Sequence, residues 1–212
     1  MAKYSVLLCV ALSLLLLVTA AGLYPGGSLG APRSDGFDWS QNFITNLFGA
    51  RALNGAANPG RWWAVAGMAF HALGQGLFFR HMSRKMPTRH AAAVLQGVGG
   101  ANLLFSFLVV TPLHDAMVHL SSAVALLGLF YVTVFVFRSR LRWFKFGCPV
   151  CLLLGYATLY LYGAGHWGAL AIMQKVSLGS ALLLVVGLEY FTHRDDFAPP
   201  HPGGPKTPAT TR

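Results

Sequence analysis

The sequence predicts an all-α, six-helix transmembrane bundle with an extracytoplasmic loop that carries a short amphipathic helix. Three observations lead to this prediction. Of the 212 residues, 55% are hydrophobic and only 10% are charged, whereas a soluble domain carries about 25% charged residues. The mean hydropathy is +0.54. The apolar residues also gather in runs of about 20, the length that a helix needs to cross a bilayer.

The six expected spans are separated by turn-forming or basic segments, and Pro112 breaks the chain between the third and the fourth. The first run could instead be a signal peptide, because Val18-Thr-Ala20 resembles a cleavage site. Its length exceeds that of a typical signal core and favours a retained helix. The expected spans are residues 4–23, 62–79, 91–110, 114–137, 146–162 and 168–191.

Residues 24–60 form the one long loop between spans. It begins with the turn Tyr24-Pro-Gly-Gly27. Residues 37–48 are expected to form a short amphipathic helix, because Asp38, Asn42 and Asn46 recur every four residues among aromatic and aliphatic ones. Such a helix would lie on the membrane or cap the bundle.

Basic residues fix the expected orientation. With the N-terminus inside, the cytoplasmic segments hold 12 Lys and Arg residues and the outer segments hold three, as the positive-inside rule requires. We therefore expect a multi-pass protein of the cell membrane with both termini in the cytoplasm. Residues 1–192 form the bundle, and residues 193–212, rich in Pro and Gly, form a disordered cytoplasmic tail. The net charge of +10 lies in short clusters between apolar runs, so it predicts contact with the lipid bilayer rather than with nucleic acid.

Ionisable and amide side chains are concentrated in the outer half of the spans. At about 1.5 Å per residue, they lie roughly 9–15 Å below the outer ends of their helices. Polar groups are costly in hydrocarbon, so they usually face a protein interior or a cavity. This predicts an outward-facing polar cavity lined by His71, Asn102, Ser106, His119 and Lys175, with His114 and Asp115 above it and Asp38, Asn42 and Asn46 closing the top.

Some of these residues also have purely structural interpretations. His71 can simply hydrogen-bond to a neighbouring helix, and Asp115 can cap the fourth span at its N-terminus, where the helix dipole favours a carboxylate. Cys148-Pro-Val-Cys151 is either a thiol redox pair or two packed thiols. Zinc could be held by His71, His114, His119 and perhaps Asp115, although their spacing differs from H-E-x-x-H.

Three stretches resemble the DUF998 family of bacterial and archaeal membrane proteins of unknown function. They are Tyr24–Gly27, then Asn42–Leu47 followed by Asn54-Gly55 and Asn58-Pro59, and Leu113-His-Asp115. The resemblance implies a helical membrane bundle and no established activity. Relatives often have Asp where this chain has Asn46. The set of Ser, Asp and His residues is also similar to the membrane pocket of the superfamily that includes alkaline ceramidases. That superfamily has seven helices and a closing His pair with no clear match here.

The expected function is non-catalytic: the polar cavity binds a lipid-like or small polar ligand, or a protein partner. The alternative is a zinc-dependent hydrolase that acts on lipid. A transporter ranks third, because the sequence lacks the repeated halves that many transporters show.

Overall fold

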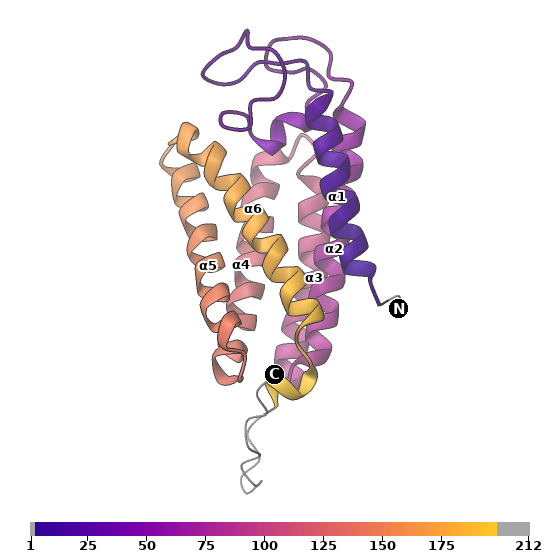
Figure 1. Ribbon diagram of the computed structural model, residues 1–212, viewed down its shortest axis with the longest axis vertical. Helices are drawn as coiled ribbons and strands as arrows, with labels where there is room; N and C mark the ends of the chain where they lie inside the picture. Colours follow the sequence, from indigo (N-terminus) through magenta and orange to yellow (C-terminus); the bar gives the residue numbers. More distant parts are fainter. Residues whose placement is uncertain (1–2, 199–212) are drawn as a thin grey trace, which may run out of the picture.

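The computed structural model describes residues 3–198 and consists of six long helices with two short 3₁₀ helices (Figure 1). No strand occurs among the described residues. This confirms the all-α, six-helix bundle, although α2 ends six residues beyond the expected end of the second span and α5 begins four residues before the expected start of the fifth. The helices are α1 (Ser5–Gly22), α2 (Arg61–Lys85), α3 (Arg89–Leu108), α4 (His114–Arg138), α5 (Arg142–Gly163) and α6 (Trp167–Tyr190), with η1 (Ile44–Phe48) and η2 (Arg194–Phe197).

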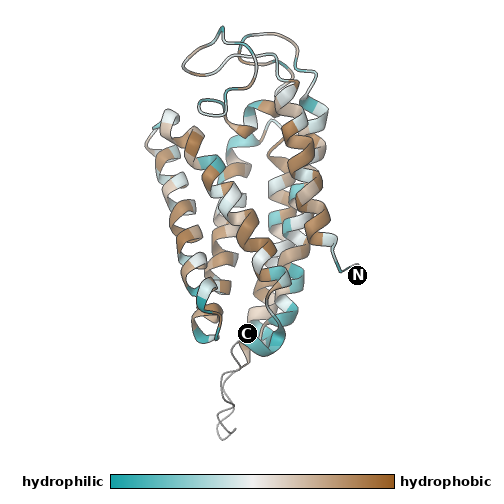
Figure 2. Ribbon diagram, in the orientation of Figure 1, coloured by the Kyte–Doolittle hydropathy of each residue, from teal (hydrophilic) through white to brown (hydrophobic). Residues whose placement is uncertain are grey.

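Five of these helices, α1 and α3 to α6, are long and apolar enough to cross a membrane. Their middle sections are predominantly hydrophobic, and hydrophilic residues gather at one end of the bundle (Figure 2). The remaining long helix, α2, has 25 residues but lower hydropathy, because it carries His71 and Gln75 in its middle and Arg80, His81, Arg84 and Lys85 near its end. It packs closely between α1 and α3 along the bundle, so neighbouring helices shield much of its surface.

The helices form two groups. Helices α1, α2 and α3 pack closely against one another, α5 and α6 pack as a pair, and α4 joins the two groups. Contact between α6 and either α1 or α2 is sparse. Near the start of α1, the Leu7 amide donates a hydrogen bond to the Tyr190 hydroxyl at the end of α6 (3.0 Å). The two groups therefore meet firmly at that end and leave room between them elsewhere.

Residues 24–60, here called the cap, cover one end of the bundle, and we call this end the cap end (Figure 1). The connectors at residues 86–88 and 139–141 lie at the opposite end, here called the basic end. The side chains of Leu47 and Phe48 are buried against α1 and α2. This packing anchors the middle of the cap on the first group of helices.

The expected amphipathic helix at residues 37–48 is wrong in extent, since only the five-residue η1 is helical. The reason is local competition from side chains. The Asn42 Oδ1 accepts a hydrogen bond from the Asp38 amide (2.9 Å), and the Asn46 Oδ1 accepts one from the Phe43 amide (2.6 Å). Asn and Asp often bond to nearby backbone in this way and favour turns over helices. The residues that suggested a helical stripe instead fold the chain into two successive turns.

The tail expected to be disordered from residue 193 is ordered over its first residues. Helix η2 forms at Arg194–Phe197, where Asp196 accepts a hydrogen bond from the His193 amide (2.7 Å). Phe197 is buried in the same apolar cluster as Met82 and Leu188. Burial of the Phe197 side chain holds this short segment in place, although the residues around it are polar. Residues 199–212 lie outside the described part of the chain.

Candidate functional site

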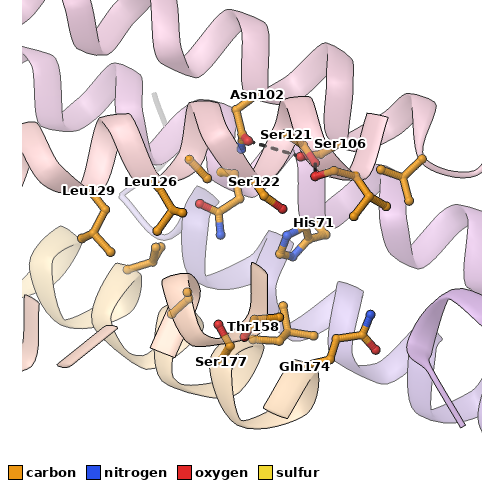
Figure 3. Close-up of a pocket in the computed structure, with 18 of the residues that line it drawn as sticks. His71, Asn102, Ser106, Ser121, Ser122, Leu126, Leu129, Thr158, Gln174 and Ser177 are labelled. Carbon is orange, nitrogen blue, oxygen red and sulfur yellow. Dashed lines mark hydrogen bonds between the residues drawn. The ribbon is translucent and has the colours of Figure 1, made fainter. Parts of the chain in front are cut away.

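A cavity of about 320 Å³ lies between the two groups of helices. Every long helix contributes to its wall, and so does η1 from the cap. Most of the wall is apolar, with ten neutral polar side chains set into it. Figure 3 shows His71 extending from α2 into the space between Ser121 and Ser122 on one side and Thr158 and Gln174 on the other. The ten polar residues are Thr45, His71, Gln75, Asn102, Ser106, Ser121, Ser122, Thr158, Gln174 and Ser177.

Half of these ten polar side chains make no hydrogen bond to the described part of the protein. Ser106 donates to Asn102 (3.4 Å), Ser121 donates to the Val118 carbonyl (3.2 Å) and Thr158 donates to the Leu154 carbonyl (2.7 Å). Within the described residues, five side chains make no hydrogen bond to the protein: those of Thr45, His71, Gln75, Ser122 and Ser177. Polar groups inside a membrane protein normally find partners. Their free donors and acceptors are therefore available to a molecule in the cavity.

Hydrogen bonds attach the cap to α6 at the cap-end edge of this cavity. The Lys175 ammonium donates hydrogen bonds to the carbonyl oxygens of Asn42 (2.5 Å) and Ala171 (2.6 Å). The neighbouring Gln174 accepts a hydrogen bond from the Ile44 amide (2.9 Å). Since Leu47 packs on α1 and α2, the cap joins the two groups of helices where their direct contact is sparse.

A row of aromatic rings lies beside this fastening. The His119 ring on α4 meets the Tyr162 ring on α5 edge to face, with 4.9 Å between ring centres. Tyr162 meets Trp167 at the start of α6 (5.6 Å), and Trp167 meets Phe43 of the cap (6.4 Å). Edge-to-face pairs at such separations are favourable beyond the area they bury. The row links α4, α5, α6 and the cap at the cap end.

Of the predicted site residues on the helices, the structure places His71, Asn102 and Ser106 in the cavity wall. The expectation that His119 and Lys175 share this wall is wrong. The Lys175 side chain turns toward the cap carbonyls, and the exposed His119 ring donates to the Asp115 carbonyl (2.6 Å) and packs on Tyr162. Both bond locally to backbone carbonyls that sequence spacing alone does not reveal.

His114 and Asp115 lie at the start of α4 and have structural contacts there. The His114 ring donates a hydrogen bond through Nδ1 to the Val109 carbonyl (2.8 Å), which closes the turn after α3. Asp115 is in the first turn of α4, where a carboxylate suits the helix dipole. It accepts a hydrogen bond from the Tyr162 hydroxyl (3.2 Å). Neither residue lines the interhelical cavity.

The predicted cap residues organise the cap itself. Asn42 is fully buried, and its amide donates to the Gly27 carbonyl (2.8 Å). Asp38 is bound by the amide (2.7 Å) and hydroxyl (2.6 Å) of Ser40, and these hydrogen bonds lower the pKa of the Asp38 carboxyl. Asn46 and His114 line a second cavity of about 360 Å³ between the cap and the α3–α4 connector. We expected Asp38, Asn42 and Asn46 to close the top of the first cavity. The cap residues that line this cavity are instead apolar Ile44 and Phe48, together with Thr45.

The expected zinc ligands do not come together. His71 lines the interhelical cavity, His114 bonds to Val109, and His119 packs against Tyr162. Zinc needs three or more protein ligands converging on one point. Within residues 3–198, no group of three or more His, Cys, Asp and Glu side chains is arranged to hold a metal ion. The arrangement therefore does not fit the zinc hydrolase that the sequence suggested as an alternative.

Cys148 and Cys151 are both buried free thiols on α5, and they do not form a disulfide. Cys151 donates a weak hydrogen bond to the Ser180 carbonyl of α6 (3.5 Å) and borders the cavity. Cys148 packs in the apolar cluster between α4, α5 and α6. Reactive cysteines are usually partly exposed and surrounded by positive charge. This pair instead has the environment of packed thiols.

Seven polar residues of the cavity wall were not among the predicted site residues: Thr45, Gln75, Ser121, Ser122, Thr158, Gln174 and Ser177. A usable signal was present, because these neutral polar residues interrupt apolar helices or the apolar part of the cap. Gln174 and Ser177 are three residues apart and share one face of α6. The predicted site was built mainly from ionisable side chains, so most of these hydroxyl and amide residues were not included. Hydroxyl and amide groups line the cavity together with the His71 imidazole, and three of the lining residues, His71, Asn102 and Ser106, were predicted.

The basic end has a separate polar network. Lys85 donates hydrogen bonds to the carbonyls of Leu188 (2.9 Å) and Glu189 (2.7 Å) in the last turn of α6. A cation at a helix C-terminus is stabilising because it meets the negative end of the dipole. The Glu189 carboxylate also pairs with the His81 ring (2.6 Å). These contacts fix α6 on α2 at the end of the bundle opposite the cap.

No family model matches this chain, and no match was found among curated proteins or solved structures. The resemblance to the DUF998 family therefore remains an expectation from short motifs, and the case for function depends on the cavity.

Proposed function

We propose that this protein is a multi-pass membrane protein that binds a lipid-like ligand in the cavity between its two groups of helices. One observation carries the proposal: ten neutral polar side chains, five of them without a protein partner, project into an otherwise apolar cavity of about 320 Å³. Ligand sites are typically concave and mostly apolar, with a few polar groups that orient the ligand. A cavity between bundled helices is a common place for such a site.

The orientation is part of the proposal. All six long helices cross the bilayer, and α2 crosses between α1 and α3 with His71 and Gln75 facing the cavity rather than lipid. The basic end faces the cytoplasm, because the basic connectors lie there. Cysteines introduced at Arg33 in the cap and at Arg84 near the basic end test this. We expect an impermeant maleimide added to intact cells to label the first and to label the second only after permeabilisation, and the reverse result would refute the orientation.

The binding itself is tested by isolating the full-length protein in nanodiscs that retain native lipid. We expect a small molecule to co-purify in a fixed ratio and to be identified by mass spectrometry of the extract. Ala181→Trp should remove it, since Ala181 lines the cavity and the larger side chain would fill the space. Leu183→Trp is the matched control, because Leu183 is two residues away on α6 and 76% exposed on the outer surface.

Two results would overturn the proposal. The first is that no molecule is enriched over nanodiscs without the protein. The second is that Ala181→Trp retains the molecule while its melting temperature matches that of Leu183→Trp. Ser177→Leu provides an independent variant, since Ser177 lies one turn from Ala181 on the same face of α6 and also lines the cavity.

A further inference from the structure

Below the apolar residues Ile44, Phe48 and Val109 at its cap end, the cavity changes from polar to apolar toward the basic end. On α6, Gln174 and Ser177 lie closer to the cap, and Leu184 and Leu188 lie closer to the basic end. Helices α4, α2 and α5 repeat this order, and α3 supplies polar residues only. On α4 the order is Ser121 and Ser122, then Leu126 and Leu129, and on α2 it is His71 and Gln75, then Phe78 and Phe79. On α3, Asn102 and Ser106 lie toward the cap, and on α5, Thr158 lies closer to the cap than Cys151.

The cavity is elongated and small. From Gln174 to Leu188 it follows α6 for 14 residues, which is about 21 Å at 1.5 Å per residue. Its volume of about 320 Å³ is at the lower end of the usual range for ligand sites, roughly 300–1,000 Å³. A long cavity of small volume fits one hydrocarbon chain better than two chains side by side.

Among the described residues, none that lines the cavity is Asp, Glu, Lys or Arg. The nearest cation on α6, Lys175, is turned to the carbonyls of Asn42 and Ala171. The carboxylate of Asp115 at the start of α4 is bound by the Tyr162 hydroxyl. A charged group brought into an apolar site without a partner is strongly disfavoured. Hydroxyl, amide and imidazole groups suit a head group that donates and accepts hydrogen bonds and has no net charge.

We infer that the ligand is an uncharged, single-chain amphiphile of the monoacylglycerol type, with its hydroxyl-bearing head near His71, Ser122 and Ser177 and its chain directed toward Leu188. This inference depends on the proposed function, because it names the ligand class of the same cavity. The free hydroxyl and amide groups contact the head, and the apolar half buries the chain, whose transfer from water is favourable for each buried CH₂ group.

The test uses photo-crosslinking with the full-length protein in liposomes. The first probe is a monoacylglycerol with a diazirine at the far end of its chain. The second is a lysophosphatidic acid with the same chain and diazirine, and the third is a diacylglycerol with one such chain. We expect saturable labelling by the first probe, with crosslinks on α6 near Leu184 and Leu188, and at least tenfold weaker labelling by the other two.

Variants that remove head-group contacts sharpen the test. The double variant Gln75→Leu and Ser122→Ala should weaken labelling by the monoacylglycerol probe about tenfold, because it removes two hydrogen-bonding groups from the wall. Leu183→Ala, on the exposed face of α6, should leave labelling unchanged. Labelling that is insensitive to the double variant, or crosslinks confined to exposed surface residues, would overturn the assignment of the head and the chain.

The outcomes separate this inference from the proposed function. If the anionic or the two-chain probe labels the cavity as well as the first probe does, and Ala181→Trp abolishes that labelling, the cavity binds lipid but the ligand class is wrong. If no probe labels the wild-type protein above the level in Ala181→Trp, and no molecule co-purifies with it, both the inference and the proposed function fail.

Discussion

Replacing Asn42 with Ala should loosen the cap, and the structure gives the size of the effect. The Asn42 amide donates to the buried Gly27 carbonyl (2.8 Å) and accepts from the Asp38 amide (2.9 Å). Within residues 3–198, no other hydrogen bond reaches the Gly27 carbonyl or the Asp38 amide. Leaving a buried group unpaired costs about 1–3 kcal/mol, and losing the more exposed bond to Asp38 costs about 0.5–1.5 kcal/mol. The two losses together span about 1.5–4.5 kcal/mol, so the free energy of local opening of the cap should fall by about 2–4 kcal/mol in the central part of that range.

Hydrogen exchange measured by mass spectrometry on cap peptides checks this value, because exchange follows local opening. A loss of this size corresponds to exchange about 30- to 700-fold faster. Asn54→Ala is the matched control, since the Asn54 Oδ1 accepts one hydrogen bond from Ala56 in an exposed turn. Acceleration below threefold in Asn42→Ala, or equal acceleration in both variants, would refute the assignment of Asn42 as the residue that holds the cap.

Three further variants test other contacts. Gly26→Ala should make the cap sensitive to limited proteolysis, because Gly26 has φ of +134° and a Cβ there would collide with the facing backbone. Gly55→Ala is the control and should have a smaller effect, because a Cβ at Gly55 meets no other atom. Hydrogen bonds from Ser40 lower the pKa of Asp38 in the folded cap, so Asp38 stabilises the cap above its ordinary pKa and this contribution is lost as pH falls through the folded value. Asp38→Asn should therefore remove the extra cap hydrogen exchange that the wild type shows as pH falls below the ordinary Asp pKa of about 4, once intrinsic rates are corrected. Asp115→Asn should lower the free energy of unfolding by less than about 1 kcal/mol, because Asn retains an oxygen acceptor for the Tyr162 hydroxyl and only the interaction of an exposed first-turn charge with the helix dipole is lost; a loss above about 2 kcal/mol would contradict this.

The fold was predictable because one physical requirement dominates it. A helix satisfies its backbone hydrogen bonds internally, so each long apolar run in a bilayer must become a helix. Composition alone therefore located α1 and α3 to α6 to within a few residues. The prediction was weakest for α2, whose polar residues lower its hydropathy and whose position depends on its neighbours.

The cap was harder to predict because short-range competition decides its conformation. Asp38, Asn42 and Asn46 are spaced for one face of a helix, but each also has a side chain that bonds to nearby backbone. Spacing does not show which arrangement has the lower free energy. Contacts that arise only after folding, such as the burial of Leu47 against α1 and α2, select the turns.

The same distinction explains which site residues were found. His71, Asn102 and Ser106 were predicted from polarity and depth, and these sites lie on faces that neighbouring helices enclose. His119 and Lys175 have similar depth and greater polarity, but carbonyl oxygens within one turn of their own helices bind both of them. A long or ionisable side chain can reach such a local acceptor and thus leave the cavity.

Short neutral side chains have less reach, so the helix face on which they lie largely decides what they contact. Ser122 and Ser177 cannot extend to the helix ends, and both remain at the cavity without a protein partner. Charged side chains near the cap end form hydrogen bonds outside the cavity, as Lys175 does with the Asn42 carbonyl. The cavity is consequently polar but uncharged. This favours a hydrogen-bonding ligand without net charge, since its partners are in place before it binds and no charge must be buried with it.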